Sequence, residues 1–542
     1  MQSYAAWLQG HLEQRARERA SAAPGTLRFS ILTTVYERTD PQLFRLTADC
    51  LTGQTLPFFE WIVLAHGPTT AALDRELAAL DLHPDVRIER LPENLGIVGG
   101  MAFCLRLATG DYVVPMDADD LLTPDALQIL AETAECSARP AFLYSDEDIL
   151  IDGKPAAPYW RPDWDPILNL SSSFIWHLCC IRRDAAVEAA LYSDSAANWC
   201  HDWDTVFRML RAGHQPVHIP LILYHWRHHP VSSTNRADPD SGSRTSTHAL
   251  LQSFIAGTAR PHLYEIEDFP IFRGAPEWTV KRRPTPPAPV ALATIGQGVR
   301  HAGLEGPWRA SGPPDDATRA APPPARAAWW RFWGGGEKRQ ESPATVGQMK
   351  RFLATTVEPL TLILSSAVEP IGEDWFWEAV KLFELHPDVA LVHGLLVNEQ
   401  GRVRRGGEVF LSDGTLVCPQ AGKPMSDPGF FALALKPHSV AAAPTDFCLA
   451  ETGLLRDLLA RLPGNAPLAG LGIRLAAAAR ERDLRTAFSP LIVGRIIGRL
   501  ADGDPAGLAQ LARITLGAPQ CETAGREIRG AAGFMNHIGE YR

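Results

Sequence analysis

Residues 112–120 read YVVPMDADD, a short apolar run that ends in a cluster of acidic residues. A short apolar run of this kind predicts a buried strand. Similar runs precede it at 29–36, 61–64 and 86–91, and segments that read as helices lie between them at 41–56, 70–81 and 97–108. Strands that alternate with helices predict βαβ units and a mostly parallel sheet. Ligands bind such sheets beyond the carboxyl ends of the strands, which is where the acidic cluster stands.

The composition is that of a globular protein with more than one domain. The chain has 542 residues, 46 % of them hydrophobic, and a net charge of −10. A length above about 200 residues favours several domains, and the acidic balance argues against a general nucleic-acid binder. The nine cysteines include no C-x-x-C pair, so we expect a reducing compartment rather than disulfides or a zinc ribbon.

The sequence predicts no membrane-spanning segment. The first residues form a polar amphipathic helix without the apolar core of a signal peptide. No run of about 18 apolar residues is free of charge. We therefore expect a cytoplasmic protein that is at most peripheral to the inner face of the membrane.

The chain divides into five parts. We expect an N-terminal helix, a first α/β domain, a Pro/Gly-rich linker that retains a first strand, a second and smaller α/β domain, and a C-terminal tail; these cover 1–26, 27–278, 279–350, 351–500 and 501–542. In the second domain we expect strands at 361–364 and 389–397, a helix at 374–385, a hairpin at 400–416, and helices over much of 447–487.

The acidic cluster suits a metal ion. Asp117 and Asp119 lie two residues apart at a strand end, and carboxylates so placed suit a hard divalent cation with oxygen ligands. The competing interpretation is that acids before a helix start only cap that helix. Taken alone, the D-x-D-D pattern leaves both interpretations open.

Further motifs resemble family 2 glycosyltransferases of the GT-A fold. The segments that carry the resemblance keep the order and approximate spacing of that family between about residues 29 and 236; they are 94–97 (NLGI), 108–112 (ATGDY), 116–127 (MDADDLLTPDAL), 144–148 (YSDED), 162–164 (PDW), 201–208 (HDWDTVFR), 224–227 (YHWR) and 232–234 (SST). The resemblance implies a Rossmann-like, mostly parallel sheet flanked by helices. It also implies transfer of a sugar from a nucleotide-diphosphate sugar in the synthesis of a surface polysaccharide.

The resemblance assigns residues to the donor and its metal. Asp119 would ligate Mg²⁺ or Mn²⁺ bridging the donor diphosphate, and Asp117 would hold the donor ribose or support the metal. His225 could be a further metal ligand, although a lone histidine is equally often structural. Three residues after the first strand would contact the nucleotide: Thr34, Tyr36 and Glu37.

The same resemblance places the general base in 201–208. Asp202 would take the proton of the acceptor hydroxyl, a step that typically contributes about 10²–10⁴-fold. Asp204 could act in its place, or could orient Arg208. The acceptor would be a glycan or a lipid-linked sugar. The turn at 64–70 (LAHGPTT) lacks the acid that commonly recognises the base in this family, so a uridine donor is only the default beside dTDP- and GDP-sugars.

The second half resembles a degenerate copy of the first domain. Segments 279–295 and 360–412 are similar to the first strand and later part of such a domain, but 365–367 read SSA where functional copies have acids. A helix near 471–480 offers Gly472, Ile473 and Arg474 in place of acids. We expect a degenerate domain that positions an acceptor or binds a partner; an unrelated α/β domain is the alternative.

Other functions remain open at this stage. A bifunctional tandem transferase and a non-catalytic protein that binds glycan or nucleotide are the two alternatives to a single inverting transferase. In the linker, the aromatic and basic segment 326–339 could settle on an anionic membrane surface, or could pack on the second domain as a helix.

Overall fold

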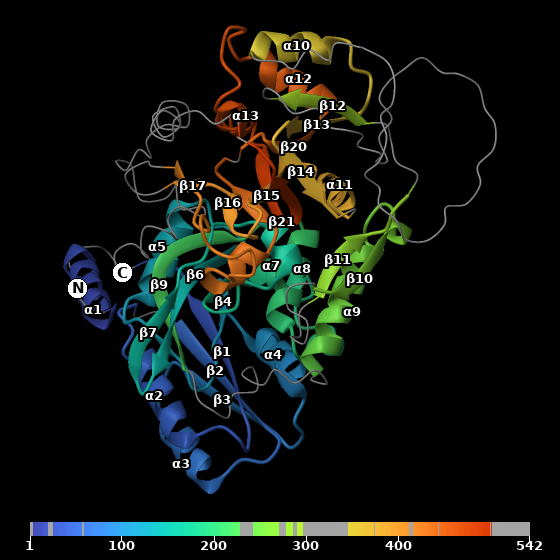
Figure 1. Ribbon diagram of the computed structural model, residues 1–542. Helices are drawn as coiled ribbons and strands as arrows, with labels where there is room; N and C mark the ends of the chain where they lie inside the picture. Colours follow the sequence, from blue (N-terminus) through green and yellow to red (C-terminus); the bar gives the residue numbers. More distant parts are fainter. Residues whose placement is uncertain are drawn as a thin grey trace.

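The fold consists of two sheets that follow one another along the chain (Figure 1). The computed structural model describes residues 4–19, 25–56, 59–227, 242–269, 278–285, 290–295, 345–372, 374–410, 416–442, 444–498 and 500. None of the helices within these ranges combines the length and the apolar character needed to span a membrane.

The first part of the chain alternates strands and helices as predicted. Its strands are β1 (Phe29–Val35), β2 (Phe59–His66), β3 (Val86–Leu91), β4 (Tyr112–Pro115), β5 (Leu121–Leu122), β6 (Phe142–Ile151), β7 (Lys154–Tyr159), β8 (Cys179–Arg182), β9 (Val217–Arg227), β10 (Tyr264–Asp268) and β11 (Trp278–Arg282). Its helices are α1 (Tyr4–Arg19), α2 (Pro41–Thr52), α3 (Ala71–Leu80), α4 (Gly96–Leu107), α5 (Ala126–Cys136), α6 (Pro166–Ser171), α7 (Arg183–Glu188), α8 (His201–Arg211) and α9 (Gly242–Ala256).

The first sheet has the order β3-β2-β1-β4-β8-β6-β9-β5, with β7 beside β6. Strands β1 to β4 are mutually parallel, which confirms the mostly parallel sheet that the alternation predicts. Strand β8 runs antiparallel to both β4 and β6, so the sheet is mixed. Helix α2 ends four residues before its predicted end, where Gly53 donates its N–H to carbonyls of the last turn.

Helices cover both faces of this sheet because successive side chains of a strand point to opposite faces. On β2, Ile62 and Leu64 pack with α4 and α8, whereas Trp61 and Val63 pack with α2, α3 and α5. All four of these β2 side chains are fully buried. The acidic loop after β4 and the start of α8 therefore lie at the rim of a rigid, two-sided core.

The second sheet is smaller. Its strands are β12 (Val290–Ile295), β13 (Leu360–Ser365), β14 (Val368–Ile371), β15 (Val389–Val397), β16 (Val403–Arg405), β19 (His438–Val440), β20 (Phe447–Glu451) and β21 (Arg485–Ile496). Its helices are α10 (Val346–Ala354), α11 (Trp375–Leu385), α12 (Thr452–Ala460), α13 (Leu471–Arg480) and the 3-10 turn η4 (Phe430–Leu435), and β17 (Val409–Phe410) forms a hairpin with β18 (Leu416–Val417). The segment 447–487, expected to be mostly helical, also contains the buried strand β20 and the start of β21.

The two sheets repeat one strand order. The first contains β1-β4-β8-β6-β9-β5, and the second reads β12-β13-β20-β15-β21-β14. Neighbouring strands run parallel, antiparallel, antiparallel, parallel and antiparallel in both. A side strand pairs with the fourth member of each series, β7 in one case and β16 in the other. This agreement supports a second domain that has a shortened version of the first domain's topology, without counterparts of β2 and β3 among the described residues.

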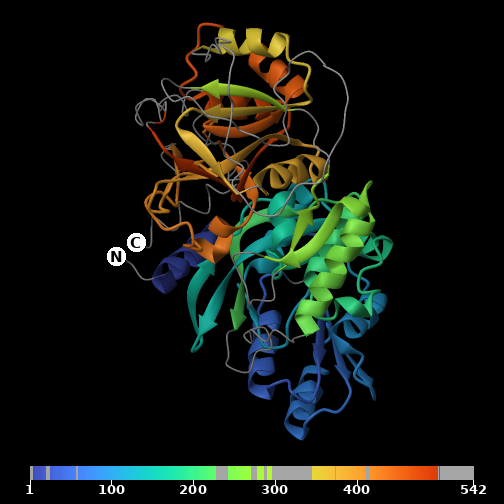
Figure 2. The same cartoon turned by 45° about the vertical axis from the view of Figure 1, so that its right-hand side comes forward.

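The two bodies meet along α6, α11 and the hairpin β10–β11, and Figures 1 and 2 show α11 beside that hairpin. The predicted boundary between 278 and 279 falls on β11, which pairs with β10 of the first part. Strand β12 lies inside the predicted linker, yet it is a full member of the second sheet. The aromatic and basic segment 326–339 and the tail 501–542 lie outside the described residues.

Candidate active site

The acidic loop is held by the strands and helix around it. The N–H of Met116 donates to the carbonyl of Leu32 on β1, and the hydroxyl of Thr33 donates to the carbonyl of Met116 at 2.9 Å. On α2, the buried hydroxyl of Thr47 lies 3.1 Å from the Ala118 carbonyl and 2.9 Å from the Asp120 carbonyl. The backbone of 116–120 is therefore set before any ligand binds.

Asp120 fastens this loop to the end of β9. Its carboxylate accepts hydrogen bonds from the Tyr224 hydroxyl at 2.7 Å and from the Arg227 N–H at 2.6 Å, and the side chain of Arg227 donates to the Asp119 carbonyl. Burial, followed by the charge of Asp117, raises the pKa of Asp120 well above its ordinary value. Asp120 thus stabilises the loop through buried hydrogen bonds, whereas the Asp117 side chain is exposed and can reach a ligand.

The acids of the cluster 117–120 do not cap the helix that follows them, α5. The N-cap position of α5 belongs to Asp125, which makes no side-chain cap. Its carboxylate instead forms a two-point ion pair with Arg15 of α1 at 2.6 and 2.9 Å. The N-terminal helix therefore docks behind the acidic loop.

His177, which the sequence reasoning missed, lies beside the loop. Its Nε2 is 3.6 Å from Asp117 Oδ2, its Nδ1 is 3.3 Å from Glu147 Oε2, and its ring stacks on Tyr224. Burial alone would lower the pKa of His177, but Asp117 and Glu147 outweigh burial and hold the pKa well above its ordinary value. No spacing in the sequence links residue 177 to residue 117.

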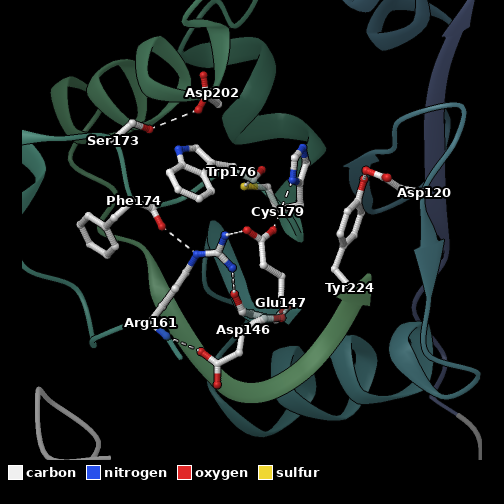
Figure 3. A network of polar contacts seen from close by, with 12 residues as sticks. Asp120, Asp146, Glu147, Arg161, Ser173, Phe174, Trp176, Cys179, Asp202 and Tyr224 are labelled. Atoms are coloured by element: carbon white, nitrogen blue, oxygen red, sulfur yellow. Dashed lines mark hydrogen bonds and ion pairs between the residues drawn. The ribbon is translucent and has the colours of Figure 1, made fainter. Parts of the chain in front are cut away.

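The segment 144–148 supplies buried carboxylates that are each paired. Glu147 lies 2.9 Å from the guanidinium of Arg161, whose side chain is wholly buried and donates to the carbonyls of Ser145 and Phe174. Asp146 accepts the Arg161 N–H and contacts His218 at 2.8 Å. Figure 3 shows this network between Asp120 and Tyr224 on one side and Asp202 on the other. The network links the acidic loop to the α8 side of the site.

His225 is oriented by the same strand. Its Nδ1 lies 2.6 Å from Asp148 Oδ1, and the second oxygen of Asp148 accepts the Tyr4 hydroxyl of α1 at 2.6 Å. Strand pairing sets His225 opposite Leu121, directly after the acidic loop. A carboxylate on one ring nitrogen leaves the other, Nε2, as the nitrogen that can bind a metal.

The two acids of α8 have different surroundings. Asp204 is buried and forms a 2.5 Å ion pair with Arg208; burial raises the pKa of Asp204, although Arg208 opposes that shift. Asp202 is half-buried and accepts the Ser173 hydroxyl at 3.2 Å. Asp204 is thus engaged with Arg208, as one of the sequence alternatives expected, and Asp202 is the more accessible acid.

The residues expected to contact the nucleotide lie at the carboxyl end of β1. Thr34 is half-buried, and Tyr36 and Glu37 are exposed. Gly100 on α4 lets that helix approach, because a Cβ there would lie 2.7 Å from the Thr34 side chain and 3.1 Å from His66. His66 accepts the Leu95 N–H at 3.1 Å and so connects the end of β2 to the start of α4. It lies in the turn 64–70, which lacks the acid that commonly recognises the nucleotide base in this family.

The residues of this site fit a divalent cation. Ligand atoms of Asp117, Asp120 and His177 lie within 4.8 Å of one another, the one such group found among the described residues. Carboxylate oxygens and an imidazole nitrogen are a donor set that Mn²⁺ accepts, and Mg²⁺ takes the oxygens. The structure does not bring Asp119 and His225 into that group; Asp119 extends from the same loop, and His225 lies next to it on β9.

The second sheet lacks these side chains at the matching positions. Strand pairing gives the match, since Leu121 and Asp148 both pair with His225, and Glu369 and Val397 both pair with Arg495. On this basis the acidic loop residues Asp117, Asp119 and Asp120 match Ser365, Ala367 and Val368. The pair Glu147 and Asp148 matches Leu396 and Val397, and the pair Tyr224 and His225 matches Gly494 and Arg495. A Cβ on Gly494 would lie 2.7, 2.9 and 3.0 Å from the side chains of Val368, Leu396 and Phe447, so apolar groups fill this place.

A mixed sheet of this order, with an acidic loop beyond β4 and an accessible acid at the start of α8, is the GT-A arrangement that the sequence resemblance implies. Comparison with known families agrees, because residues 30–163 match the family model described as Glycosyl transferase family 2. The matched segment is about a quarter of the chain and lies within the first domain, which is therefore similar to family 2 glycosyltransferases.

Three relatives resemble the chain over part of its length. An uncharacterized protein of Sinorhizobium fredii, y4gI, is 27 % identical over 39 % of this chain and 24 % of its own length. The O-antigen biosynthesis protein RfbC of Myxococcus xanthus is 26 % identical over 41 % of this chain and 17 % of its own. The amylovoran biosynthesis glycosyltransferase AmsE of Erwinia amylovora is 24 % identical over 36 % and 74 %. The chain thus spans a quarter or less of the first two.

Proposed function

We propose that the chain is an inverting glycosyltransferase that moves a sugar from a nucleotide-diphosphate sugar to a glycan or lipid-linked acceptor in polysaccharide biosynthesis. The proposal rests above all on one observation: the accessible Asp202 and the acidic loop flank the same buried network (Figure 3). The named roles of RfbC and AmsE support a polysaccharide product.

We assign Mg²⁺ or Mn²⁺ to the acidic loop. Asp119 and His225 are the proposed ligands, Asp117 holds the ribose or supports the metal, and Thr34, Tyr36 and Glu37 contact the nucleotide. Such a cation stabilises the charge that grows on the leaving phosphate. Asp117 and Glu147 hold the pKa of His177 above its ordinary value, so a cation bound beside Asp117 would oppose protonation of this ring.

Asp202 is the proposed base. It is half-buried and its contact with Ser173 leaves room for a second hydrogen bond, because a carboxylate has several acceptor sites. The carboxylate of Asp204 is instead buried and engaged in its ion pair with Arg208. In the transfer, the acceptor O–H gives its proton to Asp202, its oxygen bonds to the anomeric carbon, and the nucleoside diphosphate leaves with the electron pair of the broken bond.

The second domain is proposed to be non-catalytic. The loss of Asp119 and His225 to Ala367 and Arg495 supports this proposal, and so does the apolar filling around Gly494. A bifunctional tandem enzyme would need metal ligands at those positions.

Donor binding and hydrolysis test these assignments. Thermal unfolding with UDP-, dTDP- and GDP-sugars, each with and without Mn²⁺, should reveal one donor class that stabilises the protein only with metal; a ligand at a hundredfold excess over Kd contributes about 2.7 kcal/mol. With that donor, Asp119→Ala should abolish metal-dependent stabilisation and nucleoside diphosphate release. Asp202→Asn should keep the stabilisation but lose turnover by about 10²–10⁴-fold.

A matched control distinguishes the domains. Ser365→Ala alters the position that corresponds to Asp117 and should leave binding and hydrolysis unchanged. Full activity of Asp119→Ala would overturn the metal assignment. Loss of activity in Ser365→Ala, at unchanged stability, would instead support a working second site.

A further inference from the structure

Helix α6 belongs to the first domain, yet its beginning is held by the second. The N-cap residue Asp165 is buried and accepts the Ile167 N–H at 3.0 Å. The same carboxylate accepts the Ser439 N–H at 2.6 Å and the Ser439 hydroxyl at 3.0 Å. Since Ser439 lies on β19, the cap of α6 is completed by the second sheet.

The body and the end of α6 are also tied to the second domain. Ile167 is 1 % exposed and packs in the apolar cluster of the second sheet with Leu362, Val392 and Ala487. Directly after the helix, the ammonium of Lys436 donates to the Ser172 hydroxyl at 2.8 Å, and both residues are buried. The second domain therefore contacts α6 at its first turn, through the side chain of Ile167, and directly after its last residue.

The C-terminal part of α6 and the residues after it also contact the helix that carries the proposed base. The indole N–H of Trp203 donates to the Asn169 carbonyl of α6 at 2.9 Å. One residue beyond Ser172, the hydroxyl of Ser173 donates to Asp202 at 3.2 Å. Trp203 and Asp202 are neighbours at the start of α8. One hydrogen bond therefore connects α6 to the residue beside the base, and a second, visible in Figure 3, connects the segment just after α6 to the base itself.

We propose that the second domain positions Asp202 of the first domain through α6, with Lys436 and Ser439 as the positioning residues. This inference rests on the proposed role of Asp202 as the base. It gives a domain that lacks the proposed metal ligands at the matching described positions a task in the reaction: it holds the acceptor side of the active site in place. Lys436 and Ser439 touch neither substrate nor metal, and they act through Ser172 and Asp165.

The physical reason is that a base must lie within hydrogen-bond reach of the acceptor hydroxyl, about 2.6–3.2 Å. A shift of about 1 Å in a reacting group can cost about 100-fold in rate. The donor and its metal would lie on the acidic loop, which β1, α2 and β9 hold without α6. Loosening α6 should therefore slow turnover and leave donor binding unchanged.

The test compares Lys436→Met and Ser439→Ala with a control at the same domain junction. Glu384→Gln weakens the contacts of α11 with Arg260, Tyr264 and Arg282, which lie on a segment other than α6. For the full-length chain, hydrolysis of the nucleotide-sugar selected by the thermal screen is measured with Mn²⁺. We expect kcat to fall about tenfold to 100-fold in the two α6 variants at unchanged KM, and to stay within about twofold in Glu384→Gln.

A mutant cycle separates positioning from general loss of structure. Lys436→Met introduced into Asp202→Asn should cause no further loss, because the group that it positions is gone. An equal loss in both backgrounds, or an unchanged kcat in Lys436→Met and Ser439→Ala, would overturn the inference. If Asp202→Asn itself keeps full kcat, the base assignment is wrong and the inference falls with it, whereas loss in Asp202→Asn without loss in Lys436→Met overturns the inference alone.

Discussion

The buried pair of Arg161 and Glu147 allows a quantitative prediction. The Arg161 side chain is 0 % and the Glu147 side chain 3 % exposed, and their charged atoms lie 2.9 Å apart. Arg161→Met would leave Glu147 with His177 alone, and would leave the carbonyls of Ser145 and Phe174 without this donor. Removing one partner of a buried pair costs about 3–5 kcal/mol, so we expect a loss of that size in the free energy of unfolding.

The double variant should be less damaged than the sum of its parts. Replacing a buried ion pair by apolar residues is often neutral or better, and the second sheet already carries Leu396 at the position of Glu147. For Glu147→Leu with Arg161→Met, the remaining cost is that of the two carbonyls, about 1–3 kcal/mol each at most. We expect the double variant to be more stable than the sum of the single losses implies by about 2 kcal/mol or more.

Urea unfolding of the four proteins, followed by circular dichroism at pH 7, measures this coupling. Arg461→Met provides the control, since its ion pair with Glu481 in the second domain is exposed on both sides and should cost less than about 1 kcal/mol. Additive losses in the double variant, or a loss below about 1 kcal/mol in Arg161→Met, would show that the two side chains do not behave as a coupled buried ion pair.

Three further predictions concern separate parts of the molecule. Tyr4→Phe removes the hydroxyl that holds Asp148, and should weaken Mn²⁺ binding in the presence of nucleoside diphosphate by about 10-fold to 100-fold by electron paramagnetic resonance; unchanged affinity would remove α1 from the metal site. Gly494→Ala inserts a methyl group among side chains at 2.7–3.0 Å, and should cost about 1–3 kcal/mol in urea unfolding; equal or higher stability would mean that this place is not filled. Burial would lower the pKa of His218, but Asp146 and then Asp163 raise it above its ordinary value, so its stabilisation is present below about pH 6.5 and is lost as the pH rises through the folded pKa. The stability advantage over His218→Gln should therefore shrink between about pH 6 and pH 8, and an advantage that grows with pH would contradict this sign.

Local patterns predicted the first sheet well because its strands are short apolar runs separated by helices. The run before Asp117 is β4, and the preceding three runs are β1, β2 and β3, of which β3 has the predicted bounds. The second domain was harder to read. Strand β20 (Phe447–Glu451) lies in a segment expected to be mostly helical, because a short buried strand and a buried helix turn share the same apolar composition.

Local sequence patterns were enough to predict the alternation of strands and helices, the position of the acidic loop at a strand end, and the lack of matching acids at 365–367. These features depend on residues close together in the chain. The partners of those residues, in contrast, depend on how the whole chain folds. His177 reaches Asp117 across sixty positions, Tyr4 reaches Asp148 over a separation of 144, and Lys436 reaches Ser172 over 264. Such contacts follow from how whole elements pack, and no local spacing records which buried polar groups will meet.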